Sequence, residues 1–423
     1  MCTLILLLAL LGLIVIYAID YRLNVFGYKV INPVSVLTII WFVTLLIHRL
    51  YFGVAQYTSI TYFCIMIGII CFACGFWITE KFHFSFFKQR KIEKYNMVFF
   101  KKLVIILTVL ELLRVFYVLI LVLELAGSLD VFIYNSTYVR RLYLSRSDSL
   151  LSNIFEFFLN ANAMIGYVII PIYAINKSKK KWGIVVFWVM LELLFALITM
   201  SKMSFILFLI ILISSYLGNL GDIRTQKKKI KKIIPILVLG VALFLILIGL
   251  QRNYGQFGDS IVMVVLKKAV FYLTSSVEAL GKYMSLYESD VEGGRNIFII
   301  ISRILERLHI ISSSGVLSHA EFIDIKYEST NVYSWFRTFY LDFSYAGYII
   351  GPIIIGTIMG CIYNPNRNRI SNQICNAWII GTVAMSFYTY LWGQTIYVFV
   401  LVYAVVLEFV LGKWLYCSEN NSR

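Results

Sequence analysis

The segment Lys227–Gly255 reads KKKIKKIIPILVLGVALFLILIGLQRNYG and has the features of a helix that crosses a membrane. Lysines are concentrated at its start, and roughly nineteen apolar residues follow them. An α-helix rises about 1.5 Å per residue, so this run is long enough to cross ~30 Å of hydrocarbon. Because Lys and Arg accumulate at cytoplasmic helix ends, Arg252 is expected on the far side of the membrane.

The composition places the whole chain in the same class. Of its 423 residues, 60% are hydrophobic and 14% are charged, whereas soluble domains are closer to half apolar and a quarter charged. The net charge of +16 lies in short clusters between apolar runs. Such clusters are typical of membrane topology, and they differ from a groove that follows nucleic-acid phosphates. The sequence therefore predicts an all-α, polytopic integral membrane protein with membrane lipids around it and no nucleic-acid partner.

Similar apolar windows predict about eleven transmembrane helices. They are residues 2–19, 34–53, 60–79, 98–122, 153–174, 183–200, 203–219, 233–251, 339–362, 374–391 and 396–412. Lys and Arg are concentrated in every second connection, which predicts an external N-terminus and a cytoplasmic C-terminus. The expected organisation is helices 1–8 within residues 1–251, a large external loop at 252–338, and helices 9–11 with the C-terminus at 339–423.

The long loop is the expected seat of function, because long loops between otherwise short connections usually carry it. Its segment SIVMVVLKKAVFYLTSSVEAL (260–280) is apolar but interrupted by two lysines, which predicts an interfacial or re-entrant helix. The segment NIFIIISRILERLHII (296–311) has isoleucines on one helical face and Arg303, Glu306 and Arg307 on the other. It predicts an amphipathic helix that either lies on the membrane or brings an arginine into a site.

Arginines are the main candidate ligand-binding residues in this sequence. No P-loop, dinucleotide fingerprint, HExxH or GxSxG motif is present, and no two of the four histidines have metal-ligand spacing. No metal and no cofactor are therefore expected. The guanidinium fork suits phosphate and diphosphate oxygens. The candidate diphosphate-binding residues are Arg252, Arg337, Arg140, Arg141, Lys202, Arg303 and Arg307, although membrane anchoring or loop solvation also explains such residues.

Three further patterns concern groups inside the predicted spans. Glu111 and Arg114 lie three residues apart on one helix, which favours a structural ion pair. Glu192 and Glu408 are single carboxylates that need partners from other helices. Asp342 lies just inside a span that Arg337 precedes. Glycines then follow at positions 347, 351, 356 and 360, for close helix packing or substrate passage.

The sequence resembles the Wzy family, the O-antigen and capsular repeat-unit polymerases of bacteria. The likeness covers most of the chain. It rests on NPVSVLTIIWFVTLLIHRLYFG (32–53), LITMSKMSFILFLIILISS (197–215), QRNYG (251–255) and RTFYLDFSYAGYIIGPIIIGTIMG (337–360), in this order and spacing.

The resemblance implies a GT-C-like membrane glycosyltransferase at the outer face of the bacterial inner membrane. Its substrates would be undecaprenyl-diphosphate-linked oligosaccharides, and a chain-length regulator would be a further partner. The nascent glycan would be transferred onto the terminal sugar of a new lipid-linked unit, with arginines in place of a divalent ion. The acceptor hydroxyl needs at most a general base, for which Asp342, Glu306 and His309 are candidates. Lys202 stands where related ligases often have arginine, so it lacks the bidentate fork.

Two other functions fit parts of the pattern. An O-antigen ligase would use the same chemistry with a different acceptor. A lipid-linked oligosaccharide flippase or other transporter would more typically show internal repeats and short loops on both sides. The sequence shows no convincing repeat, which favours the glycosyltransferase.

Overall fold

The computed structural model describes residues 2–22, 32–53, 58–81, 95–146, 149–177, 182–219, 225–226, 228–233, 261–287, 291–312, 322–326, 328–363 and 369–416. These residues are almost entirely helical, which confirms an all-α polytopic membrane protein. Among them, eight helices are long and apolar enough to cross a membrane. They are Thr3–Arg22, Pro33–Phe52, Ser59–Thr79, Met97–Ala126, Leu150–Asn176, Trp182–Thr199, Trp335–Ile362 and Thr395–Leu415.

The remaining three predicted spans have different outcomes. Helix α9 (Lys202–Gly218) and helix α15 (Ile370–Ala384) exist, with 17 and 15 residues respectively. The span expected at 233–251 lies, apart from its first residue, outside the described residues. The total of eleven thus stays a prediction.

The chain folds as two compact units. The first consists of Met1–Lys88, Lys268–Asn366 and Ile379–Val398, and the second of Gln89–Lys267, Arg367–Trp378 and Phe399–Arg423. Helices α11 (Ile261–Leu286), α15 and α16 (Thr395–Leu415) contribute residues to both units.

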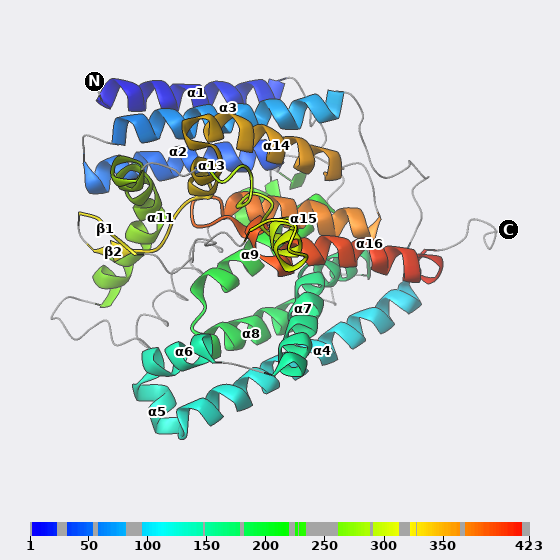
Figure 1. Cartoon of the computed structure of the whole chain (residues 1–423). Helices are drawn as coiled ribbons and strands as arrows, with labels where there is room; N and C mark the ends of the chain where they lie inside the picture. The colour runs from blue at the N-terminus through cyan, green and yellow to red at the C-terminus, as the bar shows by residue number, and fades with distance from the viewer. Residues whose placement is uncertain are drawn as a thin grey trace. The chain divides into compact units, whose positions relative to one another are not determined.

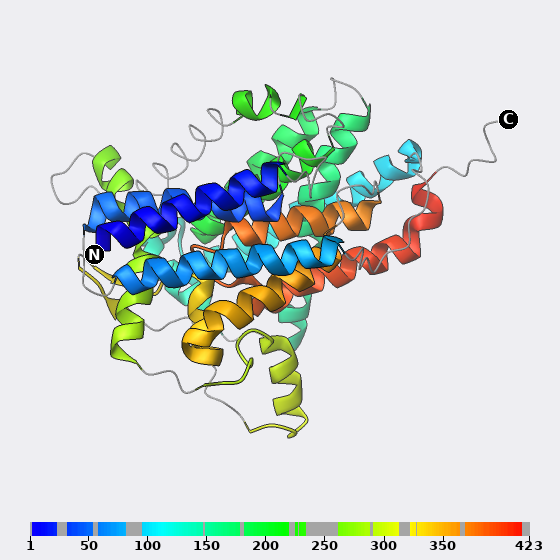
Figure 2. The same cartoon turned by 90° about the horizontal axis from the view of Figure 1, so that it is seen from above.

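In the first unit, helices α1, α2, α3 and α14 run side by side (Figures 1 and 2). Its elements are α1 (Cys2–Arg22), α2 (Pro33–Phe52), α3 (Thr58–Lys81), most of α11, α12 (Ile299–Arg307), β1 (Ile323–Asp324), β2 (Ser329–Thr330), α13 (Trp335–Phe343), the 3₁₀ turn η3 (Ser344–Ala346), α14 (Gly347–Ile362), η4 (Leu391–Gly393), and parts of α15 and α16. The two short strands pair antiparallel.

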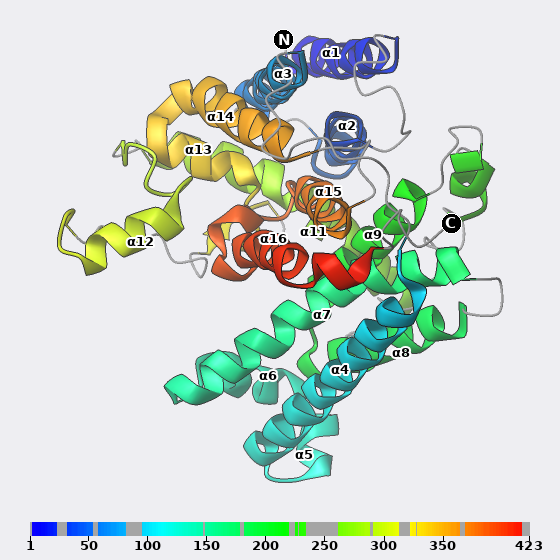
Figure 3. The same ribbon diagram turned by 90° about the vertical axis from the view of Figure 1, so that its right-hand side faces the viewer.

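In the second unit, helix α4 packs against α7 and α8 (Figure 3). The elements are α4 (Met97–Ala126), α5 (Leu129–Tyr134), α6 (Ser136–Ser145), α7 (Leu150–Lys177), α8 (Trp182–Thr199), α9, and parts of α15 and α16 (Thr395–Leu415).

The start of α2 is determined by its own sequence. The side chain of Asn32 caps the helix by accepting from the Ser35 amide at 2.9 Å, and Pro33 occupies the first turn. The amide nitrogen of Asn32 donates to Asp20 at 2.8 Å. This contact ties the end of α1 to the start of α2.

Glycines bring α3 and α14 into close contact. A Cβ atom on Gly75 would overlap the backbone carbonyl of Ile353, and one on Gly356 would overlap that of Phe72. Side chains at these positions would force the two backbones apart. The predicted close packing of this glycine series is therefore confirmed for α14.

The predicted span at 339–362 is bent near its start. Helix α13 ends at Phe343, Ser344 adopts a left-handed φ of 52°, and α14 begins at Gly347. Gly347 and Gly351 leave room for α13, because a Cβ on either would overlap Phe339. Arg337 and Asp342 consequently lie on one short helix that folds against α14 (Figure 1).

The two helices predicted within the long loop are both present. Helix α11 is continuous through its two lysines, and α12 is strongly amphipathic. Helix α12 protrudes from the other helices of the first unit (Figure 3). Its apolar residues Ile301 and Ile304 are more than half exposed, at 56% and 52%.

Replacing Gly356 by alanine is expected to lower stability by about 1–3 kcal/mol, because the added methyl group overpacks a backbone contact. Gly183→Ala is the matched control. No atom lies within 4 Å of its Cβ position, so helix propensity alone predicts a gain of up to ~1 kcal/mol. Thermal unfolding in detergent measures both variants. Equal melting temperatures for the two would contradict the close contact.

Candidate functional site

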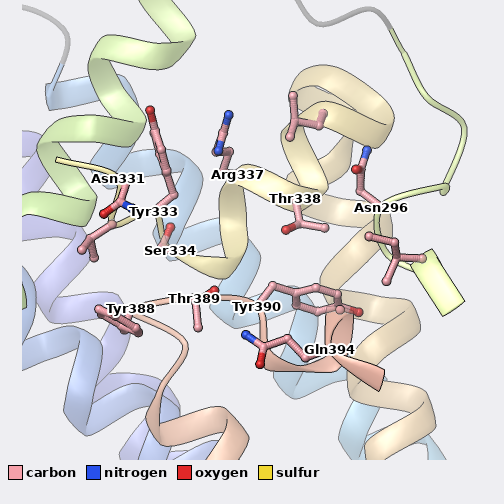
Figure 4. A pocket seen from close by; sticks show the side chains of 14 residues that line it. Asn296, Asn331, Tyr333, Ser334, Arg337, Thr338, Tyr388, Thr389, Tyr390 and Gln394 are labelled. Carbon is pink, nitrogen blue, oxygen red and sulfur yellow. The ribbon is translucent and has the colours of Figure 1, made fainter. Parts of the chain in front are cut away.

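A cavity of about 260 Å³ opens beside Arg337 in the first unit (Figure 4). Its walls are the segment that enters α13, the segment that follows α15, and the residues at the start of α12. Most lining residues carry neutral polar groups or tyrosine rings. The polar ones are Asn296, Asn331, Tyr333, Ser334, Arg337, Thr338, Tyr388, Thr389, Tyr390 and Gln394.

Arg337 lies against two aromatic rings, which contact one another edge to face. Its guanidinium carbon lies 3.9 Å from the ring centroid of Tyr333 and 4.5 Å from that of Tyr283. The side chain is largely buried, with the residue 6% exposed. Cation–π contacts of this kind are stronger in a desolvated setting, and they restrict the orientation of the guanidinium plane. The arginine that the sequence placed at a span entrance is thus preorganised at the cavity.

The start of α13 is fixed by a buried serine. Ser386 accepts the backbone N–H of Trp335 on its carbonyl oxygen and the indole N–H of Trp41 on its hydroxyl, both at 2.9 Å. The first contact satisfies a helix-start N–H that has no intrahelical partner. The second joins this corner of the cavity to α2.

Helix α11, which carries Tyr283, is held to α2 and α3 by a buried histidine. The Nε2 atom of His48 lies 3.1 Å from the Glu278 carboxylate, and its Nδ1 atom lies 2.8 Å from the Tyr62 hydroxyl. All three side chains are buried. No role was predicted for His48, yet it orients helix α11, whose Tyr283 contacts the Arg337 guanidinium.

Asp342 organises the part of the cavity wall that Asn296 forms. Its Oδ1 accepts from the backbone and side-chain nitrogens of Asn296, both at 2.9 Å, and its Oδ2 accepts from the Ile297 amide at 2.7 Å. Gly293 and Gly294, with φ values of 66° and 91°, allow the chain to turn toward the carboxylate. In this arrangement Asp342 positions Asn296 in the cavity wall. Its role as a general base stays a prediction.

Tyr390 reinforces the same wall. Its hydroxyl donates to the carbonyl oxygen of Ile297 at 3.0 Å. Burial, with the nearby Asp342 carboxylate as a second cause, raises the pKa of the Tyr390 hydroxyl above its usual value. The hydroxyl therefore remains a protonated donor.

The other candidates of the first unit lie on or after α12, away from the described lining. Arg303, Arg307 and His309 are exposed, and Glu306 is partly exposed. His309, two residues after the end of α12, has a left-handed φ of 55°, and its amide donates to the Glu306 carbonyl at 3.0 Å. The structure does not bring these four residues together with Arg337.

In the second unit, two of the residues predicted to bind diphosphate, Arg140 and Lys202, lie at the turn between α8 and α9. The guanidinium of Arg140 donates to the carbonyl oxygens of Thr199, at 3.2 Å, and of Met200. A cation at the carboxyl end of a helix complements its dipole. Lys202 begins α9 directly after this turn, whereas Arg141 is exposed. The arrangement gives Arg140 a structural contact and leaves diphosphate binding by these residues a prediction.

Arg252 lies outside the described residues. Tyr333 and Gln394, which line the cavity, had no place among the sequence candidates. Neither had Tyr283 and Ser386, which support lining residues from outside it. The Gly293-Gly294 pair is a local sequence signal for this part of the site, since adjacent glycines indicate a sharp turn.

The cavity therefore presents one guanidinium among neutral hydroxyl, amide and aromatic groups. Hydroxyls and amides suit sugar hydroxyls, and a guanidinium suits a phosphate or carboxylate. No protein-family model, curated protein or solved structure matches the chain.

Asp342→Asn is expected to loosen the segment that carries Asn296. The asparagine amide group would face a backbone N–H donor, and an unsatisfied buried donor costs about 1–3 kcal/mol. Hydrogen exchange followed by mass spectrometry should show faster exchange at residues 295–298. Asp324→Asn, at an exposed carboxylate of the same unit, is the control. Unchanged exchange in the Asp342 variant would refute the positioning role.

Proposed function

We propose that this chain is a membrane glycosyltransferase that polymerises undecaprenyl-diphosphate-linked oligosaccharide repeat units of an O-antigen or capsule. The reaction would take place at the outer face of the bacterial inner membrane. The observation that carries the proposal is the cavity lined by Arg337, whose guanidinium lies against the rings of Tyr283 and Tyr333. The motif resemblance to the Wzy polymerases supports the same reaction class.

The lining suits a saccharide better than an apolar ligand. Asn331, Thr389 and Gln394 offer amide and hydroxyl groups that both donate and accept hydrogen bonds, as sugar hydroxyls require. Tyrosine rings offer flat apolar surface beside them. A small number of directed polar groups around such surface is typical of a ligand site.

The reaction requires positive charge at the leaving group. The bond between the anomeric carbon of the nascent glycan and its phosphate oxygen breaks, and the acceptor hydroxyl oxygen bonds to that carbon. The hydroxyl proton is released, and undecaprenyl diphosphate departs with the bonding electron pair. A fixed guanidinium stabilises the developing charge with little reorganisation, because the tyrosine rings already orient it. In this proposal Arg337 contacts the diphosphate.

The position of α12 suits a lipid-linked substrate. Ile299, its first residue, lines the cavity, while Ile301, Ile304 and Leu308 are exposed. An amphipathic helix with arginines on its polar face is typical of the membrane interface. Its apolar face would rest among the acyl chains beside the cavity, where the lipid part of the substrate stays while the sugar enters.

Arg337→Ala is expected to abolish long glycan chains in a strain that lacks the gene and expresses the variant. Loss of one preorganised donor typically costs about two orders of magnitude in rate. Arg337→Lys should retain part of the activity, because lysine keeps the charge and loses the fork. The glycan ladder on a gel measures the outcome, with membrane expression checked by blot.

Arg49→Ala is the matched control. Arg49 belongs to the same unit, hydrogen-bonds Thr3 at 3.3 Å and does not line the cavity. It should give a full ladder. A full ladder from Arg337→Ala would remove Arg337 from the reaction. Long glycans that accumulate on the lipid carrier in the deletion strain would indicate a ligase instead, and a full ladder in that strain would refute the polymerase assignment.

A further inference from the structure

The second unit contains a buried cluster of two carboxyl groups and one guanidinium. The Nη2 atom of Arg114 lies 2.9 Å from Oε1 of Glu111 and 2.5 Å from Oε1 of Glu192. The Glu111–Arg114 pair that the helix spacing predicted is therefore confirmed, and Glu192 has its partner. The three side chains are at most 3% exposed.

Neutral groups surround the cluster on its other sides. From α7, the Tyr167 hydroxyl lies 3.3 Å and the Asn160 side-chain oxygen 3.5 Å from Nη1 of Arg114. From α8, the Phe195 ring lies 3.9 Å from the guanidinium carbon. The charged groups that face the cluster from the helices α4, α7 and α8, as far as these are described, are thus Glu111, Arg114 and Glu192 themselves.

The cluster lies at mid-span. Glu111 is the fifteenth residue of the 30-residue helix α4, and Glu192 lies in the second half of the 18-residue helix α8. Water cannot compensate a net charge at that depth, and an isolated charge at a bilayer centre costs several kcal/mol. With both carboxyl groups ionised, the cluster would carry one uncompensated negative charge.

We propose that Glu111 and Glu192 form a proton-binding site in which one proton is shared by two carboxyl groups that both face Arg114. One carboxylate then pairs with the guanidinium, and the other group, protonated, keeps the cluster neutral. Both Oε1 atoms contact the same nitrogen, Nη2 of Arg114, so the two carboxyl groups lie beside one another, as expected for groups that share a proton. The unused oxygen Oε2 of Glu111 has no hydrogen-bond partner among the described residues.

This site has a consequence for the packing of the second unit. The bound proton makes it possible for α4, α7 and α8 to meet around a polar centre without a net charge. Release of the proton would leave a negative charge at mid-span, so occupancy of the site and the packing of these helices are coupled. The inference is independent of the proposed glycosyltransferase activity.

Infrared difference spectroscopy of the purified protein near neutral pH tests the site. Subtracting the spectrum of Glu111→Gln, and separately that of Glu192→Gln, from the wild type should reveal one protonated-carboxyl C=O band in each case. Either substitution leaves a single carboxylate on Arg114, so no proton is needed. Glu124→Gln, at an exposed glutamate of the same helix, should reveal only a carboxylate band. Absence of the protonated band from both differences would overturn the proposal.

Thermal unfolding gives a second test that does not need the spectra. Each single glutamine variant should unfold near the wild-type temperature, because its cluster is neutral. The double variant should unfold at a clearly lower temperature, since it leaves the guanidinium without a carboxylate. If each single variant is as unstable as the double variant, both carboxylates are required in ionised form and the shared proton is refuted.

Discussion

The contact between α3 and α14 is the constraint on which the first unit depends. Backbone meets backbone at Gly75 and Gly356, so the separation of the two helices is set by atoms that cannot rotate away. Gly347 extends the same principle to α13, which folds against α14 with Phe339 in contact. Arg337 lies two residues before Phe339. The position of the guanidinium in the cavity therefore follows from glycines that never contact it.

Buried polar groups provide the remaining order in both units. Water is absent from the hydrocarbon region, so backbone and side-chain groups there have to be satisfied within the protein. The carbonyl oxygen of Ser386 accepts a backbone N–H at the start of α13, and the Asp342 carboxylate accepts two backbone N–H groups that follow a glycine-rich turn. The Arg114 guanidinium contacts two carboxyl groups. Each of these groups joins segments distant in sequence. In the first unit, the result is a cavity whose polar wall is built before any substrate arrives.

The features that could be predicted from the sequence are those set by residues close together in the chain. Contacts between helices distant in sequence could not be predicted. Span positions follow from local apolar runs, and eight of the eleven predicted spans are confirmed among the described residues. The Glu111–Arg114 pair follows from helical spacing and is confirmed as well. The bend at Ser344 was missed, because its flanks are apolar on both sides. The tyrosine contacts of Arg337 and the partner of Glu192 could not be predicted, since they depend on which helices become neighbours. Arg337 was found because an arginine at a span entrance is conspicuous locally.

The central claim is that the cavity beside Arg337 receives the sugar part of a lipid-linked oligosaccharide. Site-specific photo-crosslinking tests this most directly, with a photoreactive residue at Thr389, which lines the cavity, or at Leu8, which is exposed on α1. The account predicts that the Thr389 probe captures labelled lipid-linked glycan, that Arg337→Ala reduces this capture, and that the Leu8 probe captures none. Glycan capture equal at both positions, or absent at Thr389 in a protein that still polymerises glycan, would contradict it.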